Sequence, residues 1–248
     1  MIYIHSLQSE WLKTKRSAAS WLCVIGGFFI PLIYFIVFLK NHSTINDLGA
    51  GMWEQHFHKL WRDMAIFLLP MGVILSSSLI TQMEYKNNTW KQLHTTPQRF
   101  TTVFFAKFSV ILLMTLKFFL FFNIGIILSG ILPTLIFNGS LPNESIPLMP
   151  FLRGNANVFL TCLPIIAIQY LISLNFKNFL VPIGIGLLGL IGSLIGMMWK
   201  YIWVSPYSYP SMMVVKFTSI NIQLYAFVYF VLIMAVSYFI YIRKSEKG

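Results

Sequence analysis

Few side chains in this sequence are placed where they could carry out chemistry. The chain has no GxxxxGK[ST] phosphate loop, no HExxH and no paired CxxC, which excludes ATP hydrolysis by this chain alone and gives no motif for a metal. All seven acidic residues, from Glu10 to Glu246, fall in loops or at the edges of apolar segments. Proton-driven carriers usually need buried Asp, Glu or His relays, so we expect the energy for any transport to come from a partner.

Two histidines fall in a segment with helical spacing, from Trp53 to Met64. On a helix, His56 and His58 point about 200° away from each other, so a shared metal site is not expected. We expect both imidazoles to be solvated or to face lipid headgroups. The segment itself predicts a short helix lying on the outer membrane surface and leading into the second span.

Lys117 is the one charged residue deep inside an apolar segment. It lies about 15 Å beyond Lys107 along a helix. A charge at that depth is costly unless it reaches water or snorkels. Two interpretations stay open: Lys117 faces a water-filled translocation path or a partner subunit, or the span begins later or tilts.

The elements that position these residues are membrane spans. Of 248 residues, 57% are hydrophobic and only 10% are charged, against about 25% in soluble domains, and the mean hydropathy is +0.72. A helix needs about twenty apolar residues to cross a bilayer core. Six segments have this length: 21–39, 64–83, 101–132, 156–176, 178–199 and 218–242. We therefore predict an all-α membrane protein, with one transmembrane domain over residues 1–248.

The net charge of +11 is explained by the flanks of these spans. Cytoplasmic flanks collect Lys and Arg, and with the N-terminus inside, the inner segments carry more of them than the outer segments. This favours both termini in the cytoplasm of a cell, and no nucleic-acid partner is expected. Cys23 and Cys162 lie within apolar segments and are expected to be reduced packing residues.

Residues 1–19 predict an amphipathic helix on the inner leaflet. Ile4, Leu7 and Trp11 share one face, and Lys13 and Arg16 point away from it. An ordinary frayed leader is the alternative. The polar and aromatic residues expected at the interface are Glu10, Trp11, Lys13, Lys15 and Arg16.

The loop after the second span reads EYKNNTWKQLHTTP from Glu84 to Pro97. Thr-Thr-Pro ends a helix, so a short cytoplasmic helix between spans two and three is expected. In the fifth span, small residues share one side at Gly186, Gly189, Gly192 and Gly196. They favour close helix packing, against a neighbour in the same chain or in another.

The EWLKTKRS helix, the six spans and the loop after span two together resemble the ABC-2 family of transporter permeases. The closest resemblance is to permease subunits of lantibiotic-immunity and bacitracin-resistance type exporters. The positions that carry it are Glu10, Lys13, Lys15, Arg16, Glu84, Asn87, Thr89, Trp90, Lys91, Leu93 and Pro97.

The resemblance implies a bacterial cell-membrane permease that is not itself an enzyme. It implies dimerisation with a copy or a related subunit, and a cytoplasmic ABC ATPase that carries the ATP and Mg²⁺, with no cofactor bound to this chain. It also implies membrane lipid as a partner and export of antimicrobial peptides or other amphipathic compounds. The ATPase would couple through the N-terminal helix and through Glu84, Tyr85, Lys86, Asn87, Asn88, Thr89, Trp90, Lys91 and Leu93.

Other functions stay open. A second branch of the same family exports lipid, polysaccharide or ions. From a different class, a non-transporting scaffold or sensor would fit the same composition. A membrane enzyme acting on lipids would need convergent polar or acidic groups at one depth, and the sequence has no such set.

Overall fold

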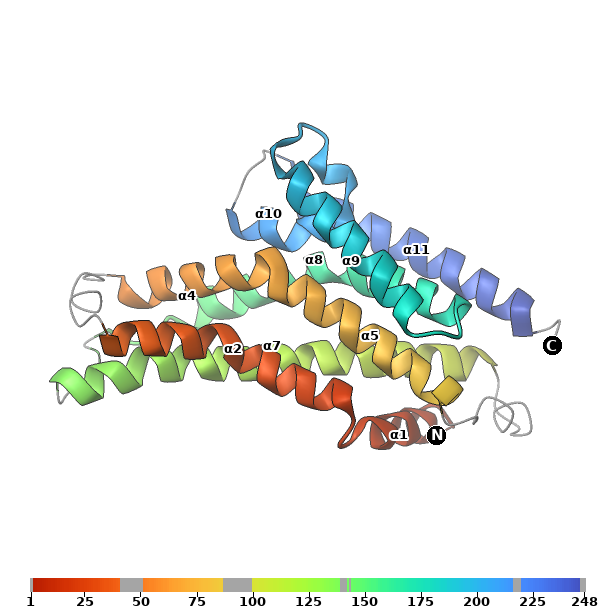
Figure 1. Ribbon diagram of the computed structural model, residues 1–248, viewed down its shortest axis with the longest axis horizontal. Helices are drawn as coiled ribbons and strands as arrows, with labels where there is room; N and C mark the ends of the chain where they lie inside the picture. The colour runs from red at the N-terminus through yellow and green to blue at the C-terminus, as the bar shows by residue number, and fades with distance from the viewer. Residues whose placement is uncertain are drawn as a thin grey trace.

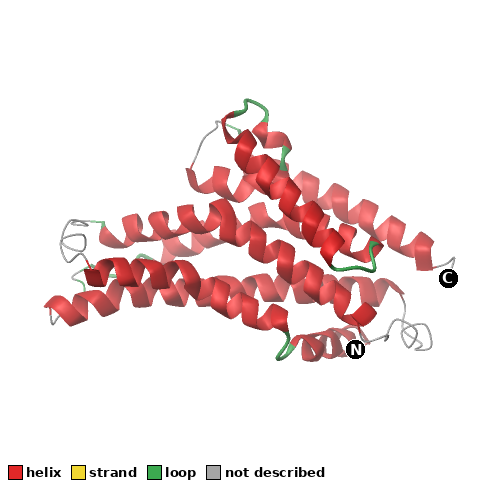
Figure 2. Cartoon of the chain, viewed as in Figure 1, coloured by secondary structure: helices red, strands yellow, loops and turns green. Residues whose placement is uncertain are grey.

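The computed structural model describes residues 2–40, 51–86, 100–138, 142, 144–215 and 220–245 (Figure 1). Nearly all of these residues are helical, and this described part of the chain contains no strand (Figure 2). Six of its helices are long and apolar enough to cross a membrane. The predicted fold class, an all-α membrane protein with six spanning helices, is confirmed.

The first half of the chain forms one surface helix and three long spans. Their bounds are α1 (Ile2–Thr14), α2 (Ala18–Lys40), α4 (Met52–Asp63), α5 (Leu69–Lys86) and α7 (Phe100–Asn138). A π-helical turn, Met64–Leu68, joins α4 to α5 without a break. α4 and α5 therefore form a single bent span from Met52 to Met83.

The second half of the chain contains more helix breaks than the first half. It contains α8 (Leu148–Asn175), α9 (Leu180–Ile195), α10 (Tyr209–Val215) and α11 (Ile222–Ser245). Three 3₁₀ turns stand between α9 and α10: Gly196–Met198, Ile202–Val204 and Pro206–Ser208. α9 and α11 are the least buried of the six spans, because they lie at the edge of the bundle (Figure 1).

α2 and α7 run side by side in the same direction. Lys117 of α7 reaches Ser20 near the start of α2, and Gly125, two turns further along α7, faces Pro31 of α2. A Cβ added at Gly27 would lie 3.1 Å from the carbonyl oxygen of Phe118, so the glycine allows this close approach. The N- and C-terminal ends lie at the same end of the bundle (Figure 1).

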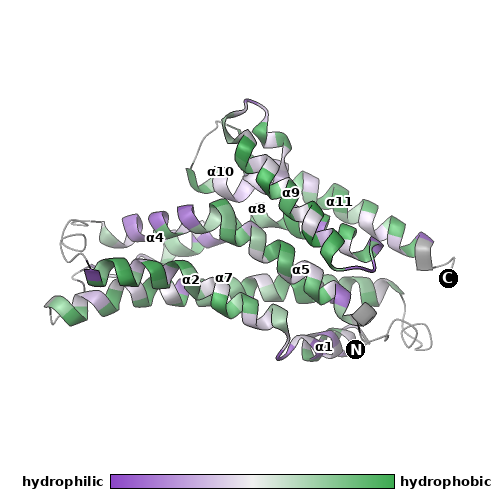
Figure 3. Cartoon of the chain, viewed as in Figure 1, coloured by the Kyte–Doolittle hydropathy of each residue, from purple (hydrophilic) through white to green (hydrophobic). Residues whose placement is uncertain are grey.

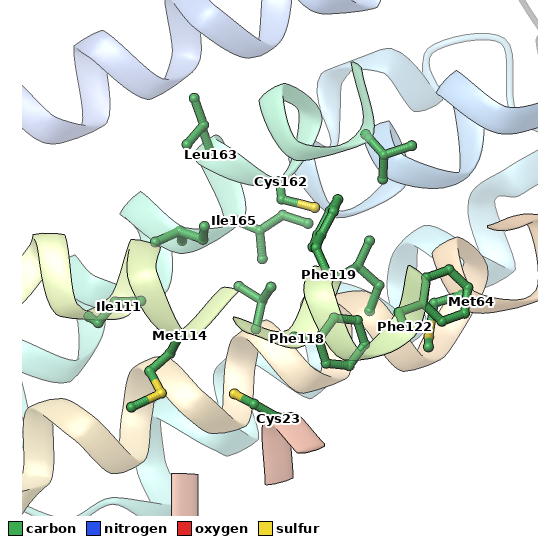
Figure 4. Packing of buried hydrophobic residues seen from close by; sticks show 14 of the residues in the cluster. Cys23, Met64, Ile111, Met114, Phe118, Phe119, Phe122, Cys162, Leu163 and Ile165 are labelled. Atoms are coloured by element: carbon green, nitrogen blue, oxygen red, sulfur yellow. The ribbon is translucent and has the colours of Figure 1, made fainter. Parts of the chain in front are cut away.

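An aromatic core holds α4, α7 and α8 together. The Trp61 ring lies 5.0 Å from the Phe119 ring and 4.7 Å from the Phe122 ring. Cys23 and Cys162 are buried, free thiols in this core, as predicted for packing residues (Figure 4). Aromatic rings bury large areas, so these contacts fix how the spans sit against one another.

The expectation of an interfacial helix before span two is wrong. Trp53, Leu60 and Trp61 of α4 are fully buried, and α4 packs inside the bundle as an extension of α5. An amphipathic pattern records only that one face is apolar. Here a protein core covers that face, where the sequence predicted lipid.

Candidate functional site

The inner-side features expected from the sequence gather at one end of the bundle. α1, the last turn of α5 and the first turns of α7 lie at the same end as both termini (Figure 1). α1 packs against α7, and the Tyr3 hydroxyl lies 2.8 Å from the Ser109 hydroxyl of α7. This end therefore brings together the N-terminal helix, the last turn of α5 and the first turns of α7.

α1 faces α7 with a polar line of side chains. Ser6, Glu10 and Thr14 follow at one-turn intervals, and all three are buried. The Thr14 hydroxyl donates to the Trp11 carbonyl at 2.7 Å, and Glu10 forms an ion pair with Lys13. Buried polar groups need such partners, and here both partners lie within α1 itself.

The remaining sides of α1 are exposed. Ile4, Trp11 and Leu12 project apolar groups away from the protein, while His5 and Lys13 are exposed beside them. An exposed apolar strip on a membrane protein suits lipid. Ile4 and Trp11 belong to the apolar face expected from the sequence, whereas Leu7 of that face packs against the core. A position on the inner leaflet stays a prediction.

The corner between α1 and α2 contains the other basic residues. Lys15 and Arg16 are exposed there, and Arg16 has a left-handed backbone with φ of 66°. Such a residue turns the chain sharply between two helices. Ser17 follows, and its hydroxyl accepts from the Ser20 backbone N–H at 3.3 Å, which caps the start of α2.

A side chain that the sequence did not single out secures the C-terminal end of α5. Gln82 is buried, and its amide Nε2 donates to the carbonyl of Phe176 at 2.5 Å and to that of Ser173 at 3.3 Å. These bonds tie α5 to the end of α8. The signal of Gln82 in the sequence is a polar group at the end of an apolar run.

The predicted coupling residues extend beyond this anchor. Glu84, Tyr85 and Lys86 form the last turn of α5, and their side chains lie outside the described part of the chain. The rest also fall outside the described residues: Asn87, Asn88, Thr89, Trp90, Lys91 and Leu93. Their role stays a prediction.

Lys117 faces α2 of its own chain. Its Nζ donates to the Ser20 hydroxyl at 2.5 Å and lies 6.0 Å from the centre of the Phe121 ring. Ser20 stands in the first turn of α2, so Lys117 is level with the start of the first span. α7 is 39 residues long, far more than a bilayer needs, which explains a charge in mid-helix. A place on a translocation path stays a prediction.

The family model for the ABC-2 family transporter protein matches residues 6–193, which is most of the chain. The chain belongs to the ABC-2 family. This makes it a multi-pass transport component that associates with ABC ATPase components. Comparison with curated proteins gives no match, and comparison with solved structures gives none either.

The glycines of α9 divide into two groups in this ABC-2 permease. A Cβ at Gly186 would overlap the Gln169 amide, and one at Gly189 would lie 2.6 Å from the Tyr207 ring. Gly192 faces open space, and a Cβ at Gly196 would only touch Ile202. The first pair packs within the chain, while Gly192 has no close neighbour among the described residues.

Gly186 and Gly189 lie next to a buried hydrogen bond between Gln169 and Tyr207. The Gln169 amide donates to the Tyr207 hydroxyl at 2.8 Å, which links α8 to the turn before α10. Burial raises the pKa of Tyr207, and the Gln169 bond opposes that rise. The phenol therefore stays neutral. The bond joins α8 to the turn before α10, and α9 packs against both bonded side chains.

The two histidines of α4 lie on opposite sides of the helix, as predicted. His58 is exposed, but His56 is fully buried, so the expectation of two solvated imidazoles is wrong for His56. The His56 Nε2 lies 3.0 Å from the Ser129 hydroxyl. Within the described residues, no three His, Cys, Asp or Glu side chains could hold a metal ion together.

Proposed function

We propose that this chain is the permease subunit of an ATP-driven exporter, and that its substrates are antimicrobial peptides or other amphipathic compounds taken from the membrane. The observation that carries the proposal is the inner end of the bundle, where α1 is anchored on α7 beside the exit of α5. Membership of the ABC-2 family supports it.

In this mechanism the chain contains no motor of its own. A cytoplasmic ATPase pair binds ATP and Mg²⁺, closes, and pushes on the segment from Glu84 to Leu93. The bond from Gln82 to α8 passes that movement to the bundle, because α5 cannot shift at its inner end without moving α8. Two permease subunits, identical or related, then alternate between inward and outward states. Both termini lie in the cytoplasm, and the membrane is that of a bacterium.

The test is transport in vesicles that contain the permease and its ATPase. We expect Glu84→Ala combined with Trp90→Ala to abolish ATP-dependent export while ATP hydrolysis continues. Lys200→Ala is the matched control, since Lys200 is exposed in a turn after α9. Export at the wild-type rate by the double variant would refute the coupling role of this segment.

Export of a lipid, polysaccharide or ion by the same machinery is the nearest alternative. It shares the ATPase and the coupling segment, so only the substrate dependence of hydrolysis separates it. Stimulation of hydrolysis by a membrane-active peptide, and not by bilayer lipid alone, supports the peptide assignment. A scaffold or sensor would give no nucleotide-dependent movement of any solute.

A further inference from the structure

One side of α4 exposes charged residues at a depth where the neighbouring helices expose apolar residues. Hydrophilic residues recur along α4 (Figure 3). Its exposed residues follow helical spacing, and they are Glu54, Gln55, His58, Lys59 and Arg62. Glu54 is 71% exposed, His58 58% and Arg62 54%. We refer to these five residues as the α4 polar face. It does not belong to the inner end described above.

The depth of this face follows from contacts on the buried side of α4. Trp53 packs over Gly130 of α7, where an added Cβ would lie 2.8 Å from the ring. Two turns later, Trp61 packs on Phe119 and Phe122. α4 therefore lies level with residues 119–130 of α7.

At the same depth the neighbouring helices expose apolar side chains. α7 exposes Leu120, Ile124 and Leu128, and its exposed apolar surface continues outward to Phe137. α2 exposes Ile33, Ile36 and Val37 beside Tyr34, whose hydroxyl donates to Asp63 of α4 at 2.7 Å. On α8, Leu152 and Leu160 are exposed with Arg153, whose stem can carry its charge outward along them.

Lipid tails are a poor cover for the α4 polar face, because charged groups at membrane depth are strongly disfavoured unless they reach water. Contact of this face with the same face of a second copy is disfavoured as well. A two-fold axis along the membrane normal would then set Lys59 against Lys59 and Arg62 against Arg62. We therefore expect water to reach this face.

The charges on the face are ordered along the membrane normal. Glu54 stands at the end of α4 away from both termini, and Arg62 lies about 12 Å deeper along the helix. The Glu54 carboxylate is 4.0 Å from the His58 imidazole, and the Arg62 guanidinium bonds Asp63 at 3.1 Å. Lys59 makes no ion pair with any described residue, and the bond from Arg62 to Asp63 is made by the guanidinium Nε.

We propose that the α4 polar face lines a water-filled recess in the outer half of the membrane and binds a zwitterionic amphiphile there. The anionic group, of the phosphate type, lies at Lys59 and Arg62, and the ammonium group points outward to Glu54. That order matches an amphiphile whose phosphate is nearer its tail than its amine. The placement of this recess in the outer half of the membrane rests on the proposed function, in which both termini lie in the cytoplasm.

The first test is chemical access to the face. The full chain is placed in phosphatidylcholine vesicles, with His58→Cys compared to Ile124→Cys, an exposed apolar site of α7 at the same depth. We expect a charged, membrane-impermeant thiol reagent to modify the cysteine at position 58 at least tenfold faster, since the thiolate requires water. Equal slow rates, or a disulfide between two copies at position 58, would overturn the recess.

The second test is binding by the purified permease without nucleotide. The probes share one acyl chain and differ in headgroup: phosphoethanolamine, phosphoglycerol and uncharged glycerol. Native mass spectrometry should give the tightest binding for phosphoethanolamine, and Lys59→Glu should weaken it about tenfold, as expected for loss of one charge-assisted contact. Lys200→Glu is the control for charge alone.

Equal affinity of Lys59→Glu and the wild type would overturn the phosphate assignment. Phosphoglycerol binding as tightly as phosphoethanolamine would overturn the ammonium contact with Glu54. Neither test uses the ATPase. A negative result in either test would therefore not contradict the coupling proposal. A negative result in the coupling test would likewise not affect these two measurements.

Discussion

The packing of α9 gives the sharpest prediction, because two glycines of one helix have opposite surroundings. A Cβ at Gly186 would overlap the Gln169 amide and lie 2.7 Å from the Ile74 side chain, whereas one at Gly184 would meet nothing within 4 Å. Overpacking of this kind costs about 1–3 kcal/mol. In a chain of this size each kcal/mol shifts Tm by roughly 2–4 °C. We expect Gly186→Ala to lower Tm by roughly 2–12 °C, from the product of these ranges.

Gly184→Ala is the matched control and should have the opposite sign. Alanine in an open helical position stabilises by about 0.5–1 kcal/mol over glycine. Thermal unfolding in one detergent, followed by tryptophan fluorescence, measures both variants. Gln169→Ala should partly relieve Gly186→Ala, because the two residues are in contact. Equal Tm changes for the two glycine variants would refute the placement of α9 on α8.

Further predictions concern polar and aromatic groups of the bundle. The amides of Asn123 and Asn155 bond each other at 2.8 and 2.9 Å between α7 and α8, so a double-mutant cycle of Asn123→Ala and Asn155→Ala should give a coupling energy of about 0.6–1.7 kcal/mol. In single-tryptophan variants, brominated lipid should quench Trp11 and leave the buried Trp61 unquenched; equal quenching would contradict the burial of α4. Lys117→Leu should lower transport and Lys117→Arg should preserve it; full transport by Lys117→Leu would remove any role for the charge.

The spans were predictable because bilayer thickness fixes how long an apolar helix must be. The outcome at α4 was not, since the same amphipathic pattern suits a helix on a membrane and one packed on a protein core. Trp53 and Trp61 looked like interfacial anchors, but they fill the contact with α7. Only tertiary packing distinguishes these two environments.

The polar contacts between helices could not be predicted from the sequence either. The bond from Tyr3 to Ser109 and the bond from Gln82 to α8 join segments far apart in the chain, and single polar residues carry no sign of their partners. The position of Lys117 relative to α2 also depends on tertiary packing. Hydropathy gives the extent of an apolar helix but not its stagger against its neighbours, and α7 begins well before α2 along the bundle.

Site-specific cross-linking from position 90 tests the central claim most directly. A photoreactive residue replaces Trp90 in the full chain expressed in its own membrane, and a second version replaces Lys59 at the opposite end of the bundle. We predict that position 90 cross-links to a protein with a phosphate-binding loop and that position 59 does not. Failure of position 90 to capture any nucleotide-binding protein, with both versions present in the membrane at equal amounts, would contradict the account of this chain as a motor-driven permease.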